Sequence, residues 1–302
     1  MHRPAPAPRR RGFSLAELLV VVAIIAILVA GLVVISGRVS QSGRGLKCLS
    51  NQRQINNANT NFATDNNGLF MSPRTDPFEP GVDDDRVWVR AYGSSIGLNG
   101  APAGQARTFT FEPGVTRERD VALIEGAAYP YLEGGIEIYK SPLDPTGRVR
   151  SYAISAYIGE ANPDSLGELA LPAGVRAARS LSDLPKPSRT IATIGEEDKG
   201  AGCNRPASFN NQGWAIKPAT DSQGWFDFPA DWLGGATTVS FADGSTETLT
   251  FIEPDLIKEL ENRAAAGFGC HRATYLGSGG GPYTVQNSDF RRFQALMLPG
   301  KV

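Results

Sequence analysis

The feature that most constrains this chain is an apolar run near its amino terminus. From Leu18 to Ile35, 18 residues follow one another without a polar side chain. As a helix they would extend about 27 Å at ~1.5 Å per residue. Adding Phe13 to Ala16 brings the length to the ~30 Å of a bilayer core. The run therefore predicts a membrane-embedded helix over residues 13–35.

The residues before this run are basic. Arg3, Arg9, Arg10 and Arg11 lie among the first eleven residues, which contain no acid. Positive charge beside an apolar helix favours the cytoplasmic side of the membrane. We therefore expect the chain to start in the cytoplasm, with everything after about residue 36 in the periplasm or outside the cell.

Three interpretations of the segment compete. A cleaved secretory signal would need an apolar stretch of only ~7–15 residues with a small-residue cleavage site after it. The stretch is longer, and Ser36 to Ser40 is a poor cleavage site. A plain membrane anchor fits the length but does not need Glu17, because a carboxylate at membrane depth costs about 2.5 kcal/mol or more. The third interpretation accounts for this carboxylate.

Residues 11–19 read RGFSLAELL, which resembles the prepilin processing site of type IV pilins and of the pseudopilins of type II secretion. The resemblance implies cleavage between Gly12 and Phe13 by the prepilin peptidase, followed by N-methylation of Phe13. It also implies that the Glu17 carboxylate pairs with the new ammonium of Phe13 on a neighbouring subunit. The implied partners are the prepilin peptidase/methyltransferase, other pilin-like subunits and the inner membrane.

Charge and composition argue against other classes of function. Loss of residues 1–12 removes four of the 30 basic residues and leaves 31 acids, so the mature chain is mildly acidic and nucleic acid is not an expected partner. His271 is the only histidine that remains, and no Gly-x-Ser-x-Gly nucleophile elbow accompanies it. We therefore expect no enzymatic activity, no cofactor and no metal.

The apolar run is expected to continue into a second helical stretch. Three glycines between residues 37 and 45 each cost a helix roughly 0.5–1 kcal/mol relative to Ala, so we expect an interruption and a bend there. The helix should resume from Leu46 through Phe62, with Ile55, Ala58 and Phe62 on one face. Residues 65–68 (DNNG) should stop it. The predicted division is leader 1–12, transmembrane and assembly helix 13–35, helix continuation 36–68 and globular domain 69–302.

The second helical stretch is also similar to a large family of bacterial pseudopilin-like proteins. Residues 48–51 (CLSN), followed by Gln54-Ile55 and the turn at residues 65–68, match the helix that follows the anchor in that family. Residues 140–145 (KSPLDP) resemble its Cys-Pro-x-Asp segment, with Ser141 in place of Cys. The resemblance thus reaches from the amino terminus into the middle of the chain.

A hairpin further along carries the third resemblance. Residues 241–245 (FADGS) are similar to the end of a His-x9-Asp-Gly stretch in the same family. Counted back from Asp243 the histidine position is Leu233, and counted from Gly234 it is Trp232. Neither is histidine, so the segment is degenerate and the role of that histidine is absent here.

The rest of the sequence predicts short strands among loops. Alternating apolar residues predict strands at residues 107–111, 136–139, 151–158 and 190–194. The clearest hairpin joins 237–242 to 245–251 through Asp243-Gly244, a turn in which we expect positive φ at both positions. Helices are expected from Pro254 to about residue 265 and from Ser288, as a cap, with Phe290, Phe293, Leu296 and Met297 facing inward. The predicted fold class is α+β and pilin-like: a long N-terminal transmembrane helix packed on an antiparallel sheet, with a loop-rich C-terminal extension.

Two further groups of residues are candidates for covalent or ionic chemistry. Cys203 and Cys270 are a candidate disulfide in an oxidising compartment, which leaves Cys48 over. Acidic runs at residues 83–85 and 196–198 could ligate calcium, but neither has EF-hand spacing, and we interpret them as solvated loops.

The sequence predicts a structural subunit of a pseudopilus or type IV pilus-like fibre. It would cross the inner membrane once, with its C-terminal domain in the periplasm or cell exterior. The alternative is a membrane-anchored extracytoplasmic binding module, for example for a glycan, that uses the pilin export route. Trp88, Trp214, Trp225 and Trp232 could then form a sugar-stacking surface, although we favour core packing for them.

Overall fold

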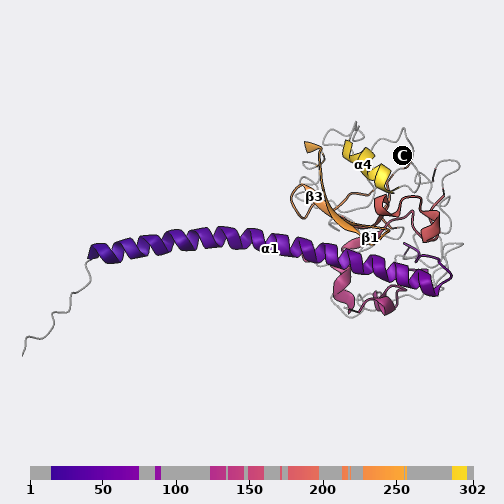
Figure 1. Cartoon of the computed structure of the whole chain (residues 1–302), viewed down its shortest axis with the longest axis horizontal. Coiled ribbons are helices and arrows are strands. Elements are labelled where there is room, and N and C mark those ends of the chain that lie inside the picture. Colours follow the sequence, from indigo (N-terminus) through magenta and orange to yellow (C-terminus); the bar gives the residue numbers. More distant parts are fainter. Residues whose placement is uncertain are drawn as a thin grey trace, which may run out of the picture. The chain divides into compact units, whose positions relative to one another are not determined.

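The chain divides into two compact units, Met1–Gly43 and Arg44–Val302. The computed structural model describes residues 15–74, 86–89, 123–133, 135–145, 149–159, 171, 176–196, 213–216, 218, 227–254, 256 and 288–297. Helix α1 begins in the first unit and ends in the second, and the other described elements all belong to the second unit (Figure 1).

Helix α1 runs without a break from Leu15 to Asp65. The expected interruption between residues 37 and 45 is therefore wrong. The helical cost of about 1 kcal/mol per glycine is small beside the backbone hydrogen bonds that a break would leave unmade. The end of the helix is confirmed. The backbone amide of Gly68 donates to the carbonyl of Ala63 at 2.7 Å, and Asn67 and Gly68 take positive φ angles of 55° and 82°, which turn the chain out of the helix.

Among the described residues, four antiparallel strands form one sheet in the order β1-β2-β3-β4. The strands are β1 (Tyr152–Ile154), β2 (Ile191–Gly195), β3 (Ala236–Phe241) and β4 (Thr246–Thr250). The predicted strand at 190–194 and the predicted hairpin are confirmed. The strand predicted at 151–158 is shorter, because the chain turns after Ile154 and the amide of Ile158 donates to the carbonyl of Ser155 at 3.1 Å.

The turn of the β3–β4 hairpin differs from the two-residue turn that was expected. Gly244 has a positive φ of 90°, whereas Asp243 does not. The amide of Gly244 donates to the carbonyl of Phe241 at 2.9 Å, and the amide of Phe241 donates to the carbonyl of Ser245 at 2.8 Å. This is a three-residue loop in which glycine supplies the bulge. The Asp243 carboxylate accepts from the Ser245 amide at 2.9 Å, which stabilises this form.

One predicted strand is a helix instead. Residues Gly135–Tyr139 form the 3-10 helix η4, and none of the described strands pairs with these residues. Three more short 3-10 helices are η3 (Tyr129–Tyr131), η6 (Leu181–Asp183) and η7 (Pro187–Arg189). The strand predicted at 107–111 lies outside the described residues, as does most of the helix predicted from Pro254, of which only residues 254 and 256 are described.

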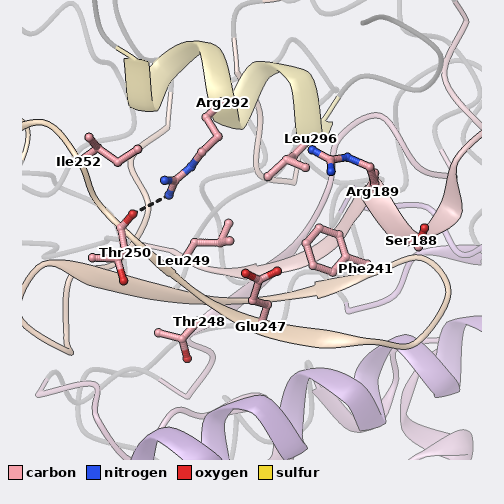
Figure 2. A pocket seen from close by; sticks show the side chains of 10 residues that line it. All are labelled: Ser188, Arg189, Phe241, Glu247, Thr248, Leu249, Thr250, Ile252, Arg292 and Leu296. Atoms are coloured by element: carbon pink, nitrogen blue, oxygen red, sulfur yellow. Dashed lines mark hydrogen bonds between the residues drawn. The ribbon is translucent and has the colours of Figure 1, made fainter.

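Helices pack on both faces of the hairpin. The predicted inward face of α1 is confirmed, since Ile55, Ala58 and Phe62 are all buried. On the opposite face lies α4 (Ser288–Met297), whose buried side chains include all four that were predicted. The Phe293 ring lies 6.2 Å from the rings of both Trp214 and Phe251. The hairpin thus lies between α1 and α4 in the second unit (Figure 2).

Candidate functional site

The amino-terminal part of α1 exposes its apolar side chains. Glu17 lies in the first turn of the helix. The large apolar residues from Leu15 to Val29 are between 44% and 79% exposed. Removing apolar surface from water is favourable by roughly 25 cal/mol per Å². This segment would therefore be more stable in an apolar environment than in water. Within the part of the chain that the structure describes, no helix reaches the length and apolar character needed to cross a membrane.

Neither of the two predicted processing residues is among the described residues. Gly12 and Phe13 lie outside the described residues, which begin at Leu15. Cleavage and methylation at this point therefore remain predictions from the sequence. The same holds for the candidate disulfide, because Cys203 and Cys270 also lie outside the described residues.

The carboxyl-terminal part of α1 is fixed in the second unit by amide side chains. Four of them exchange hydrogen bonds with backbone groups that are distant in sequence. The bonds run from Asn51 to the carbonyl of Lys140 (3.0 Å), from Gln52 to that of Thr238 (2.8 Å), from Asn56 to that of Phe241 (2.9 Å), and to Asn59 from the amide of Met71 (2.8 Å). Each such bond contributes about 0.5–1.5 kcal/mol net, and breaking one leaves a buried polar group unsatisfied.

This amide row was missed by the sequence analysis. The available signal was the recurrence of Asn and Gln at residues 51, 52, 56 and 59, a helical spacing on the side of α1 that also carries the buried residues. Asn and Gln side chains on a helix more often face solvent. Their role here is therefore evident only from the positions of the backbone groups to which they bond. The row makes this half of α1 a fixed part of the second unit.

A small polar cluster lies beside the amide row. The Sγ atom of Cys48 lies 3.0 Å from the Oγ atom of Ser141, and both side chains are buried. The Ser141 hydroxyl also accepts from the amide of Leu143 at 3.1 Å. Burial raises the pKa of the nearby Tyr152 hydroxyl above its usual range, and the neighbouring Cys48 adds to the effect. The structure therefore brings Cys48 next to Ser141. Ser141 stands where the similar pseudopilin-like family has the cysteine of its Cys-Pro-x-Asp segment.

Two of the four tryptophans are core residues. Trp88 is 1% exposed and Trp214 is 0% exposed, and their indole N–H groups donate to the carbonyls of Pro73 and Phe228. Neither can stack on a sugar at the surface. Trp232 is partly buried near Gly195, and Trp225 lies outside the described residues.

The remaining predicted sites are only partly visible. Of the two acidic runs, the structure describes Glu196, which is buried; residues 83–85, 197 and 198 lie outside the described residues, as does His271. Among the residues that are described, no three metal-ligating side chains lie together. Leu233, at one candidate histidine position, has its Cδ2 atom 3.5 Å from the place that a Cβ would take on Gly45 of α1.

Comparison with known proteins bears on the amino terminus. Residues 7–33 match the family model of the prokaryotic N-terminal methylation motif. The match covers the amino terminus alone, which resembles that of type IV pilin-like proteins. In such proteins this motif marks processing by the prepilin peptidase and assembly with other pilin subunits. No curated protein and no solved structure matches the chain.

The matched region coincides with the exposed apolar segment. The methylation motif covers residues 7–33, which contain Glu17 and every exposed apolar residue of α1 up to Val29. The match ends before the amide row begins at Asn51. The part of the motif that the structure describes, from Leu15 onward, and the fixed half of α1 are therefore separate parts of one helix.

Proposed function

We propose that this chain is a structural subunit of a pseudopilus or type IV pilus-like fibre, supporting protein secretion or surface assembly. The observation that carries the proposal is the pairing of the methylation motif at residues 7–33 with an apolar helical surface that nothing in the described chain covers from Leu15 to Val29. Neighbouring copies of the same helix would cover it in a fibre.

Residues 13–35 are proposed to lie in the inner membrane before assembly, with the second unit in the periplasm or cell exterior. The support is the sequence, in which Leu18 to Ile35 carries no polar side chain and the leader is rich in arginine. The prepilin peptidase would remove residues 1–12 on the cytoplasmic side, so the apolar helix stays on the mature protein. In this proposal the chain is the substrate of a peptidase and methyltransferase and has no catalytic activity of its own.

Glu17 would act in assembly. A carboxylate in an apolar environment costs about 2.5 kcal/mol or more when it is unpaired. Pairing with the ammonium of Phe13 on an adjacent subunit would offset that cost only at one stagger of the two helices. The pair would therefore set the register between subunits, while the apolar side chains supply most of the association energy.

The first test is mass spectrometry of the mature amino terminus from native membranes. An N-methylated Phe13 terminus supports processing as a pilin-like protein. An intact Met1 terminus, or a cut after residue 35, would overturn the proposal and leave an anchored or secreted domain.

A second test separates processing from assembly. The Glu17→Gln variant removes the charge and keeps the side-chain size, so we expect it to be cleaved yet lost from sheared fibres. Glu137→Gln is the matched control, since Glu137 is an exposed carboxylate in η4 of the second unit. Normal incorporation of Glu17→Gln into fibres would contradict the role of the charge pair.

A further inference from the structure

The two edge strands of the sheet, β1 and β4, differ in whether their outer backbone groups have hydrogen-bond partners in the described chain. At the β1 edge, the carbonyl of Ile154 accepts from the amide of Trp214 at 2.9 Å, and the carbonyl of Trp214 accepts from the amide of Ala156 at 2.9 Å. This edge is therefore covered by residues 213–216. At the opposite edge, β4 pairs with β3 alone among the described residues.

The register shows which groups of β4 point away from β3. The amide of Phe251 donates to the carbonyl of Gly235, and that of Phe241 donates to the carbonyl of Ser245, both at 2.8 Å. Hydrogen-bonded pairs alternate along an antiparallel ladder, so Glu247 and Leu249 bond to β3. Thr246, Thr248 and Thr250 alternate with these two residues and direct their N–H and C=O groups away from β3.

Only one of these outward groups has a partner in the described chain. The carbonyl of Thr250 accepts from the guanidinium of Arg292 at 2.6 Å. The backbone groups of Thr246 and Thr248 bond to no described residue. Native sheets commonly block an open edge with proline, lysine or a covering segment. The sequence of β4, TETLT, contains neither proline nor lysine.

A pocket of about 440 Å³ opens beside this edge, on the face that carries α4. Its apolar lining comes from Phe241, Leu249, Ile252 and Leu296. Figure 2 shows Glu247 pointing to this side of the strand and Thr248 to the other, as the alternation of a strand requires. A strand added to β4 would place every second side chain over the pocket.

The pocket also carries opposite charges that are not paired with each other. Arg189, from η7, and Glu247, from β4, are both exposed and both line it. Neither side chain forms an ion pair with a described residue. An acidic and a basic group on the same ligand would complement them, with an apolar group between.

We propose that the outer edge of β4 and this pocket bind an extended peptide segment of another protein as an added strand. The backbone of the segment would bond to Thr246 and Thr248, and an apolar side chain would enter the pocket. Acidic and basic side chains on the same face of the segment would lie by Arg189 and Glu247. Backbone bonding of this kind provides affinity, and the side-chain pocket provides specificity. The inference does not depend on the fibre role, because it uses only the second unit.

The test uses the full-length protein in detergent and a phage library of random linear dodecapeptides as the probe. Counter-selection on an immobilised peptide of residues 13–35 in the same detergent removes library members that adhere to the apolar part of α1. The test variant is Thr248→Pro, in which proline removes the outward N–H and leaves the ladder to β3 intact, a position at which an edge strand tolerates it. Thr248→Val is the matched control, since it keeps the backbone donor.

We expect enriched peptides that alternate around an apolar residue flanked by an acid. Their affinity should fall roughly tenfold in Thr248→Pro, because a peptide carbonyl loses its donor, and change little in Thr248→Val. Amide hydrogen exchange at Thr248 should slow when peptide binds. If Thr248→Pro folds poorly, Arg189→Glu provides the second variant and should exchange the preferred acid for a base.

Three results would overturn the proposal. One is that no peptide is enriched. Another is that enriched peptides bind the Pro and Val variants equally and leave exchange at Thr248 unchanged. The third is that Thr248→Pro abolishes self-association while no peptide binds, which would identify a second copy of this chain as the occupant.

Discussion

The contact between Cys48 and Ser141 allows a quantitative test of how α1 is held in the second unit. The substitution Ser141→Cys would place a thiol where the hydroxyl oxygen now lies, 3.0 Å from the Sγ atom of Cys48. A disulfide needs a sulfur–sulfur distance of about 2.05 Å. The two side chains would therefore have to approach by about 1 Å, which small adjustments of their χ1 angles can supply.

The expected stabilisation follows from the sequence separation. The two residues are 93 positions apart, and closing a loop of this length in the unfolded chain corresponds to about 4–5 kcal/mol in the chain-entropy model. Loss of the present hydrogen bond reduces this stabilisation by about 0.5–1.5 kcal/mol, and strain in the folded state reduces it further. We expect the oxidised variant to gain about 2–4 kcal/mol in free energy of unfolding over its reduced form.

The assay is urea unfolding of the full-length variant in detergent, followed by tryptophan fluorescence. Buried Trp88 and Trp214 report on the second unit. Peptide mapping under non-reducing conditions identifies the bond and shows whether Cys203 or Cys270 takes part instead. The double variant Cys48→Ser with Ser141→Cys is the control, since it carries the new thiol without its partner.

Two outcomes would refute this reasoning. In one, the folded, oxidised variant contains no bond between Cys48 and the introduced thiol, so the two positions are not adjacent. In the other, the bond forms and the free energy of unfolding does not rise above that of the reduced form. The first would mean that α1 is not seated at Ser141 as described. The second would mean that strain in the folded state cancels the chain-entropy gain on which the expected value rests.

Two more predictions concern glycine conformation and acid stability. Gly68→Ala should lower the free energy of unfolding by about 1–2 kcal/mol through its left-handed backbone alone, since nothing crowds its site. Gly159→Ala should lower it further in urea unfolding, because a Cβ there would lie 1.7 Å from the carbonyl oxygen of Met71. Equal losses for the two variants would contradict this close contact. Hydrogen bonds from the hydroxyl and amide of Ser288 lower the pKa of Glu253, so its contribution to stability is present above the unfolded pKa of about 4.3 and is lost as pH falls through the folded value. Stability measured from about pH 3 to 7 should therefore fall less in acid for Glu253→Gln than for the wild type, and parallel curves would be the contrary result.

Much of the local structure could be predicted because it depends on neighbouring residues. The stop of α1 at residues 65–68, the β3–β4 hairpin and the inward face of α4 all follow from short patterns whose energetics are local. Predictions failed where a pattern was too short to specify a state. The four-residue alternation at 136–139 became η4, and the turn at Asp243 gained one residue when Gly244 formed a bulge.

The sequence by itself determined the pilin-like amino terminus. The basic leader, Glu17 and the apolar run lie within one continuous stretch of chain, so their meaning needs no folding. Only the tertiary structure decided which distant groups meet. It placed Cys48 against Ser141, covered the β1 edge with residues 213–216 and left β4 open on one side in the described chain. Such contacts depend on the packing of every element at once, and no local pattern in the sequence encodes them.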